Sequence, residues 1–334
     1  MDDRAPDAAE TAGAPPDVLA QMRARIDSVL APLVPKGAPV ALLDFPDAGD
    51  AGDAAIWVGQ LEALRARDIR EPRYVATVET YDPLELRRHC PDGPILLSGG
   101  ATFGDVFPRH QELREKVLHD FPDRRIVQLP QSIEFRSASA LDAARRIVAG
   151  HRDFTLLVRS ARSLDVARRF DAPSALCPDL AARMRTPAGP PAAQRRLLWI
   201  MANGKRPPGS AAEGIESAEW PGDEPSLARR AVTWIHDRPR ALAALGRRLP
   251  PLYRRVAEAR VRRGAVLLQQ ARALATDRIH VHLMALMAGI PHCLMDDGSG
   301  TVGAYYETWT KGAGGVAWCE SADEAAARLP DLTA

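Results

Sequence analysis

The sequence has few cysteines and none of the spacings that bind a metal ion. Its four cysteines lie far apart among 334 residues and form no C-x-x-C pair; they are Cys90, Cys177, Cys293 and Cys319. This pattern excludes a disulfide scaffold and a zinc site of the usual ligand spacing. We therefore expect a reduced cytoplasmic chain with no metal.

Long apolar runs and a charge bias are also missing. No stretch of about 18 apolar residues occurs, so no transmembrane helix is predicted. The N-terminus has no apolar h-region, and we expect no secretory signal. The 44 basic and 43 acidic residues leave a net charge of +1. This balance gives no general reason to expect a nucleic acid partner, although a local basic patch remains compatible with it.

A dinucleotide-binding fingerprint is absent from the first predicted crossover. Residues 40–45 read as a buried strand, a Gly- and Asp-rich turn follows at 46–53, and a helix is predicted from Ala54 to about Ala66. This order is typical of a ligand-binding crossover, but G-x-G-x-x-G is not there. The turn's two glycines allow backbone to approach a ligand closely. Asp53 is either a ligand-facing residue or the N-cap of the helix.

What the sequence does contain is a regular alternation of strands and helices. The apolar content of 46% and charged content of 26% are those of an ordinary globular protein. Strands separated by helices predict a mostly parallel sheet with right-handed crossovers. The predicted strands of the first half are 40–45, 74–78, 94–98, 125–129 and 154–158.

The length of 334 residues exceeds the usual limit of one hydrophobic core, so two domains are expected. We predict an N-terminal Rossmann-like domain at 17–185 and a C-terminal one at 196–334, because the strand–helix pattern restarts at Arg196. The proline-rich stretch 186–195 is the predicted linker. Residues 1–16 have hardly any apolar bulk and are predicted to be a disordered leader.

Two further segments of the second half carry a functional expectation. The Gly-, Pro- and Glu-rich stretch 203–223 is predicted to be a long loop, and such loops are often functional or act as lids. The helix predicted at 252–270 has arginines at 254, 255, 260, 262 and 263. We expect these arginines to form a solvated face; a patch for a membrane surface or a polyanion is the alternative.

Asp277, Arg278 and His280 lie where a short apolar strand ending at Thr276 turns into a helix. In a doubly wound sheet this is the rim where ligands bind, and a helix N-terminus with an arginine favours an anion. The alternative is that Asp277 caps the helix and Arg278 pairs with it. Four more polar residues follow predicted strands and are expected at one sheet edge: Asp53, Thr102, Gln131 and Arg159.

An ordered set of modest motifs carries a resemblance to a known family. The motifs are Gly99 to Asp105, Val127 to Ser132, Arg159 with Ser163, Pro178-Asp179, Thr276 to His280, Gly289 to Pro291 and Tyr306 to Trp309. Together they resemble the polysaccharide pyruvyl transferases of bacterial exopolysaccharide and capsule synthesis. The resemblance covers roughly residues 39 to 320. It implies an α/β fold of two Rossmann-like domains facing a cleft, like that of GT-B glycosyltransferases.

The resemblance also implies an activity. The pyruvyl group of phosphoenolpyruvate would be moved onto two hydroxyls of a sugar in a polysaccharide repeat unit, forming a pyruvate ketal without a cofactor. The acceptor would be a saccharide, free or lipid-linked, and the enzyme would work in the cytoplasm, where the inner face of the membrane offers contact with the assembly machinery. Three departures stand out: Asp50 replaces a usual Asn, Ala101-Thr102 replaces Gly-Asn, and a usual Lys is missing near Thr301.

Phosphoenolpyruvate carries a phosphate and a carboxylate, so its site needs fixed cations or oriented N–H groups. Arg159 and Arg278 would clamp it, and His280 suits proton transfer. The second acid or base is left open among Asp53, Asp105 and Asp277, of which Asp277 is also placed to orient His280. The remaining donor candidates are Thr102, Gly104, Gln131 and Ser132, while His282 and His292 are expected to pack.

Two rival functions remain compatible with the same sequence. A nucleotide-sugar glycosyltransferase of GT-B fold would use the same rim for a diphosphate, because a fold does not fix a function. A non-catalytic saccharide-binding homologue is the other, and the three departures make it conceivable. Release of phosphate or of a nucleoside diphosphate would tell these classes apart.

Overall fold

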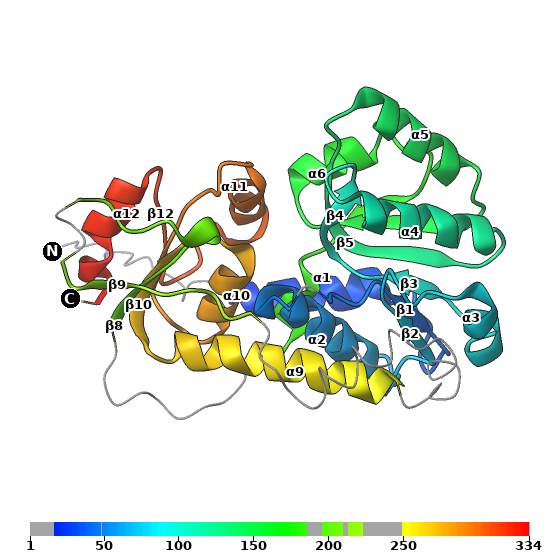
Figure 1. Cartoon of the computed structure of the whole chain (residues 1–334), viewed down its shortest axis with the longest axis horizontal. Coiled ribbons are helices and arrows are strands. Elements are labelled where there is room, and N and C mark those ends of the chain that lie inside the picture. Colours follow the sequence, from blue (N-terminus) through cyan, green and yellow to red (C-terminus); the bar gives the residue numbers. More distant parts are fainter. Residues whose placement is uncertain (1–16, 48, 186–195, 210–212, 223–248, 334) are drawn as a thin grey trace, which may run out of the picture.

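The computed structural model describes residues 17–47, 49–185, 196–209, 213–222 and 249–333. The expected leader 1–16 and linker 186–195 lie outside these residues, as do residues 210–212 and 223 of the predicted loop 203–223. None of the helices in the described part of the chain combines the length and the apolar character that crossing a bilayer requires. The fold is α/β with two parallel sheets (Figure 1).

The first sheet has seven strands, and every pairing in it is parallel. Its order is β2-β1-β3-β5-β6-β7, with β4 pairing to β5 beside that path. The strands are β1 (Ala41–Leu43), β2 (Tyr74–Ala76), β3 (Ile95–Leu97), β4 (Gly100–Gly104), β5 (Ile126–Glu134), β6 (Phe154–Val158) and β7 (Ser174–Leu176). All residues of β1, β2, β3 and β6 are buried, as expected for a sheet covered on both faces.

Most helices of the first half begin at a capping side chain; α4, whose N-cap residue is Phe107, has none. They are α1 (Val18–Leu30), α2 (Ala51–Arg65), α3 (Pro83–His89), α4 (Pro108–Asp120), α5 (Ala138–Ala149), α6 (Ala161–Ala167) and the 3₁₀ turn η1 (Leu180–Arg183). Side-chain oxygens of Asp17, Asp50, Asp82, Ser137 and Ser160 accept backbone N–H groups in the first turns of their helices. Each cap satisfies donors that have no partner inside the helix.

The strand β5 differs from the sequence prediction. Pro130 was expected to close a strand at 129, but β5 continues to Glu134. Its neighbour changes at this point: Ile126 to Gln128 pair with β3, and Gln131 to Glu134 pair with β4. A proline has no N–H to donate, so it fits the irregular step between the two pairings. The stretch after Gly99, expected as a loop, is the strand β4.

The second sheet has five parallel strands in the order β12-β11-β10-β8-β9. They are β8 (Arg196–Ile200), β9 (Ile215–Ser217), β10 (Ala271–Thr276), β11 (His292–Leu294) and β12 (Val316–Trp318). Its main helical elements are α9 (Leu249–Leu268), α10 (Ile279–Met287), α11 (Thr301–Tyr305), the π-helical turn η5 (Tyr306–Thr310) and α12 (Ala322–Arg328). β9 lies within the stretch that was predicted to be a loop, and is a three-residue edge strand.

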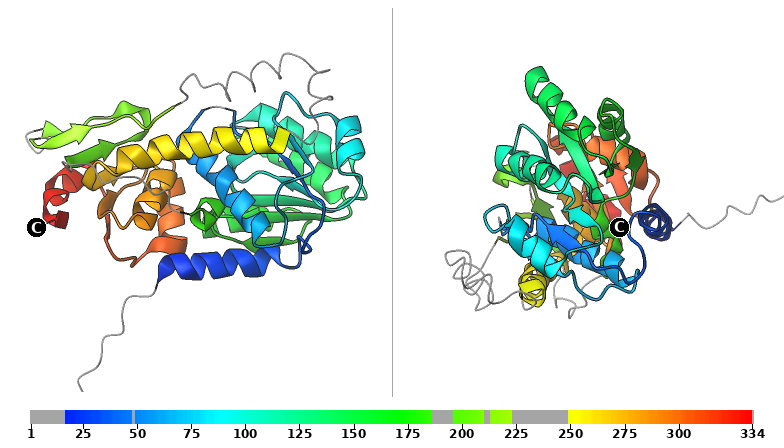
Figure 2. Two further views of the ribbon diagram at one scale, coloured as in Figure 1. Left: turned by 90° about the horizontal axis from the view of Figure 1, so that it is seen from below. Right: turned by 90° about the vertical axis from the view of Figure 1, so that its right-hand side faces the viewer.

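One apolar core joins the two sheets. It contains Met22 of α1, Trp57 of α2, Tyr253 of α9 and Tyr305 of α11, all at most 1% exposed. The helices α1 and α9 lie on opposite sides of the molecule, and each extends past the boundary between the sheets (Figure 2). Arg260 of α9 is also buried and donates to the carbonyl of Pro46 at 2.6 Å. The prediction that the arginines of this helix form a solvated face is therefore wrong for Arg260.

Candidate functional site

The strand order of each sheet reverses at one point, and these two points face each other. In the first sheet, β1 and β3 lie side by side while their connections leave in opposite directions; in the second, β8 and β10 do the same. Ligands of open α/β sheets bind at such a reversal, beyond the carboxyl ends of the strands. Arg278, which follows β10, forms an ion pair of 2.5 Å with Asp50, which follows β1.

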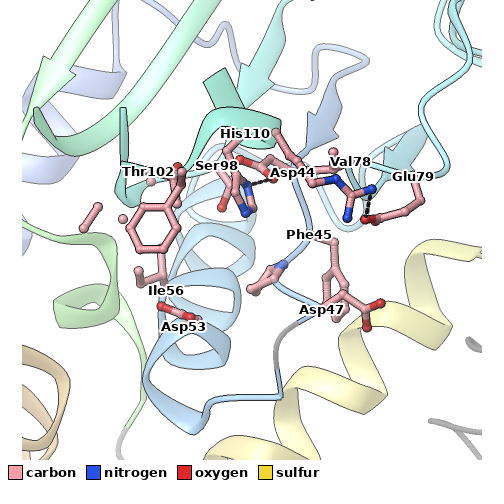
Figure 3. A pocket seen from close by; sticks show the side chains of 16 residues that line it. Asp44, Phe45, Asp47, Asp53, Ile56, Val78, Glu79, Ser98, Thr102 and His110 are labelled. Carbon is pink, nitrogen blue, oxygen red and sulfur yellow. Dashed lines mark hydrogen bonds and ion pairs between the residues drawn. The ribbon is translucent and has the colours of Figure 1, made fainter. Parts of the chain in front are cut away.

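A cavity of about 430 Å³ opens at the reversal point of the first sheet (Figure 3). This volume is in the range of pockets that enclose a small ligand. Its lining residues come from the ends of β1, β2 and β3 and the starts of α2 and α4. They are Asp44 to Asp47, Asp53, Ile56, Val78, Glu79, Ser98 to Thr102, Phe107, Arg109 and His110.

Asp50, not Asp53, caps the helix α2. Its Oδ1 accepts the N–H groups of Gly52 at 2.6 Å and Asp53 at 3.3 Å. The interpretation of Asp53 as the N-cap is therefore wrong, and its side chain is left to line the cavity. Gly52 is needed for close packing, because a Cβ there would come within 2.6 Å of the His280 ring. This contact brings the first turns of α2 and α10 together.

The contacts of Asp277 and Arg278 at the start of α10 differ from the capping turn that the sequence offered as an alternative. Asp277 is buried, and its Oδ1 accepts the N–H of Ala202 at 2.6 Å, so it joins the ends of β10 and β8. The sequence left Asp277 open as a cap of α10, a partner of Arg278 or an orienter of His280. Arg278 occupies the N-cap position without a side-chain cap and pairs with Asp50, so Asp277 neither caps α10 nor pairs with Arg278. The carboxylate that bonds His280 is that of Asp179.

His280 takes its carboxylate partner from the first half of the chain. Its Nε2 lies 3.4 Å from Oδ2 of Asp179, and the same oxygen accepts from Nη1 of Arg159 at 2.7 Å. Arg159 also donates to the Ser132 hydroxyl at 2.8 Å and is 3% exposed. Trp309 of η5 closes this group from the second half by donating to the Arg159 carbonyl at 2.9 Å.

The pKa values of two carboxyls in this site, Asp53 and Asp179, are shifted in opposite directions. Burial raises the pKa of Asp53, and the charge of Asp50 raises it further, while His280, Arg159 and Arg278 act against them. Burial would also raise the pKa of Asp179, but His280 and Arg159 hold that pKa well below the ordinary value. Adjacent groups whose pKa values are driven apart are typical of acid and base assignments.

The remaining sequence candidates are divided between the cavity and the framework. Thr102 lines the cavity, and its N–H and hydroxyl bond the Gln131 amide at 2.9 and 3.1 Å. Gly104 lies against β5, where a Cβ would come within 1.7 Å of the Glu134 carbonyl. Asp105 accepts the N–H groups of Arg136 and Ser137 at 2.7 and 2.9 Å. These bonds lower its pKa, which suits a carboxylate that fixes the chain at this point; the sequence had left it among three candidates for the second acid or base.

Asp44 and His110, which the sequence analysis did not single out, form a pair in the cavity (Figure 3). The Asp44 Oδ1 lies 2.7 Å from the His110 Nδ1, and this bond raises the pKa of His110. Asp44 has a φ of 67°, which is uncommon outside glycine and often marks a functional turn. Asp44 directly follows the observed strand β1, but the sequence predicted a strand over 40–45 that includes it, so the rule about strand ends did not apply to it. Asp179 was named only as part of a motif.

The histidines His282 and His292 are packed inside the second half. Their Nδ1 and Nε2 atoms lie 2.7 Å apart, and His282 also bonds the Thr310 hydroxyl at 3.0 Å. Burial lowers the pKa of His292 to about 4 and that of His282 well below its ordinary value. Both rings are therefore neutral at pH 7, as suits a packing role. No group of three or more His, Cys, Asp or Glu in the described ranges is arranged to hold a metal ion.

The position near the missing lysine is occupied by a tightly bonded loop. Asp296 accepts N–H groups from Gly298, Gly300 and Gly303 at 2.7 to 2.9 Å. Arg162 of α6 donates to the Ser299 carbonyl at 2.6 Å and so brings a cation to this loop. Lys311, the nearest lysine in sequence, is exposed and pairs with Glu307.

The sequence model of the polysaccharide pyruvyl transferase family matches residues 50–299. The chain is 29% identical to Pyruvyl transferase 1 of Schizosaccharomyces pombe over 304 residues, which cover 82% of this chain and 70% of that one. It is 24% identical to EpsO of Bacillus subtilis over 295 residues, covering 85% and 89%. A crystal structure of a functionally uncharacterised Klebsiella pneumoniae protein has the same fold, with a TM-score of 0.54 at 14% identity, covering 90% of this chain and 99% of the other.

Fold, reversal-point cavity and family match together define a transferase of the α/β class. The match covers most of the chain, from the cap of α2 to the loop after Asp296. The chain belongs to the polysaccharide pyruvyl transferase family.

Proposed function

We propose that the protein transfers the pyruvyl group of phosphoenolpyruvate onto two hydroxyls of a sugar and so forms a pyruvate ketal. The observation that carries this proposal is the position of Asp53. Its carboxyl lines the cavity, its pKa is raised by burial, and it lies near His280 and Arg278. A carboxyl with a raised pKa next to a histidine and an arginine is the set that this addition chemistry needs.

Under this proposal the two sheets belong to two Rossmann-like domains of GT-B type that face one cleft. The donor lies between their reversal points, where Arg278 binds its phosphate or carboxylate in a charge-assisted pair. Arg159 does not contact the donor in this proposal. It bonds Ser132 and Asp179, and so fixes the Asp179 carboxylate that orients His280. Thr102 lines the cavity, and the buried Gln131 amide bonds its N–H and hydroxyl.

The proposed chemistry has two steps. In the first, one sugar hydroxyl oxygen bonds to C2 of the donor while the electron pair of the double bond goes to C3, which takes a proton from Asp53. In the second, the other hydroxyl oxygen bonds to C2 as the bond from C2 to the phosphate oxygen breaks. Two protons leave the sugar: one restores Asp53, and the other passes through His280 to the departing phosphate. No cofactor takes part.

The acceptor is a saccharide of an exopolysaccharide or capsule repeat unit. A lipid-linked acceptor would place the enzyme in the cytoplasm at the inner membrane face, beside membrane-bound assembly proteins. Co-sedimentation with vesicles that carry a lipid-linked glycan, compared with plain vesicles, measures this contact.

The central test is incubation of the protein with phosphoenolpyruvate and a panel of free and lipid-linked glycans. A glycan mass gain that matches a pyruvate ketal, together with an equal amount of released phosphate, is expected. Release of a nucleoside diphosphate from nucleotide sugars instead would show a glycosyltransferase. Glycan binding with neither product would show a non-catalytic protein.

A further inference from the structure

Arg278, the residue that our proposed function assigns to the donor, already has an anionic partner within the chain. Its Nη2 donates to Oδ2 of Asp50 at 2.5 Å, although the two residues are 228 positions apart. The side chains are 28% and 29% exposed. An anion that enters from solvent can therefore reach this pair, and must replace or share the carboxylate to bind the guanidinium.

The two oxygens of Asp50 have separate tasks. While Oδ2 binds Arg278, Oδ1 accepts the N–H groups of Gly52 and Asp53 and so caps α2. Asparagine caps a helix about as well as aspartate, because one carbonyl oxygen is sufficient. The cap therefore needs no charge, and the negative charge of Asp50 acts on Arg278 alone or on other charges of the site.

Building on the proposed function, we propose that Asp50 is a positioning residue that holds Arg278 while the donor is absent and yields it to the donor's phosphate or carboxylate. The exchange selects by charge. A neutral ligand cannot replace a carboxylate on a guanidinium, whereas a phosphate can accept two of its N–H bonds at once. Asp50 would thus reserve Arg278 for an anionic donor.

Replacement of Asp50 by the donor on Arg278 would also change the pKa of Asp53. Burial is the largest cause of the raised pKa of Asp53, the charge of Asp50 adds to it, and His280, Arg159 and Arg278 oppose it. Once Arg278 turns to the donor, Asp50 loses its counter-ion and the donor brings further negative charge. Both changes favour the protonated form of Asp53. Donor binding would therefore favour the protonated Asp53 that donates to C3.

Calorimetric titration with phosphoenolpyruvate tests the exchange directly. We expect Asp50→Asn to bind it about fivefold more tightly than the wild type, because the donor no longer competes with a part-exposed ion pair. The matched control is Asp82→Asn. Asp82 caps α3 with bonds of 2.8 and 3.3 Å to Leu84 and Glu85, close to those of Asp50, but in an exposed position. It should leave both affinity and thermal stability unchanged.

A double-mutant cycle locates the effect. In an Arg278→Ala background, Asp50→Asn should bring no gain in affinity, because the arginine for which the two anions compete is gone. The proposal is overturned if Asp50→Asn binds phosphoenolpyruvate as the wild type does or more weakly, or if its gain persists without Arg278.

Binding does not require ketal formation, so this test separates the inference from the proposed function. If the wild type does not bind phosphoenolpyruvate, inorganic phosphate is the probe: tighter phosphate binding by Asp50→Asn supports the exchange while the donor assignment fails. If neither anion binds any variant, both ideas fall. Where ketal formation is measured, Asp50→Asn should lower kcat. Because the charge that raises the pKa of Asp53 is gone, the loss of kcat at alkaline pH should begin at a lower pH than in the wild type. An unchanged pH profile of kcat would refute the effect on Asp53.

Discussion

At the scale of single residues, His280 is expected to act on turnover and not on donor binding. It bonds Asp179 and touches Gly52, whereas our proposed function assigns the donor's charge to Arg278. His280→Ala should lower kcat by about 10²-fold or more, the usual contribution of a positioned proton-transfer group. Parallel measurements of turnover and of phosphoenolpyruvate binding check this. His119→Ala, on an exposed side chain of α4, is the control, and normal turnover by His280→Ala would remove the proposed role.

A second residue-scale prediction concerns pH and the pair of Asp44 with His110. Their hydrogen bond raises the pKa of His110 above its ordinary value, although burial acts against it. A group with a raised folded-state pKa stabilises the fold fully below its unfolded pKa, and this contribution is lost as pH rises through the folded pKa. Asp53 and Arg114 also act on this ring, in opposite directions.

Thermal unfolding between pH 5 and 9 measures this contribution. Asp44→Asn should lower Tm in acid, and the difference from wild type should shrink as pH rises past the folded pKa of His110. Asparagine tolerates the φ of 67° at this position, so the backbone itself should not be strained. A difference in Tm that does not vary with pH would show that the bond is not between charged groups.

At the scale of elements, local signals predicted the long helices and buried strands well. The helix α3 (Pro83–His89) begins where the local sequence signals a start, with Asp82 as cap and Pro83 in the first turn. The strands β7 and β9 were missed: each has three residues, and neither is fully buried, so neither shows an apolar run. The course of β5 past Pro130 depends on β4 lying beside it, which no local pattern encodes.

The same limit applies to the site. The rule that ligand-binding side chains follow parallel strands directed attention to Asp53, Arg278 and His280. It could not say which partner each takes, because the bonds of Arg278 to Asp50 and of His280 to Asp179 span 228 and 101 residues. Such pairings depend on how the two sheets face each other.

Gly59 allows an element-scale prediction about the packing of α2 against η1. A Cβ at this position would lie 1.8 Å from the backbone carbonyl oxygen of Leu180. Because backbone on both sides must shift, Gly59→Ala should cost about 3 kcal/mol or more of unfolding free energy. Urea denaturation measures it. Gly314→Ala, where no atom lies within 4 Å of the new Cβ, should change stability by less than about 0.5 kcal/mol.

At the scale of the whole molecule, the two sheets come from different halves of the chain but share one apolar core. The cluster that includes Trp57 and Tyr305 also contains residues of α1, α9 and α10, and Phe45 packs edge-on against both Trp57 and Tyr253 at 4.9 and 4.4 Å. Two further clusters lie apart from it, one in each half. Either half alone would expose a large apolar face.

Chains of this length often unfold in stages, domain by domain. Here we expect a single cooperative transition, because separating the halves would expose the shared core at a cost of about 25 cal/mol per Å² of apolar surface. Urea titrations followed by tryptophan fluorescence and by far-ultraviolet circular dichroism should coincide in midpoint and slope. Trp57 reports on the shared core, and Trp199 reports on the cluster confined to the second half. Two resolved transitions, or midpoints that differ between the probes, would show that each half is stable without the other and that their contact contributes little to the fold.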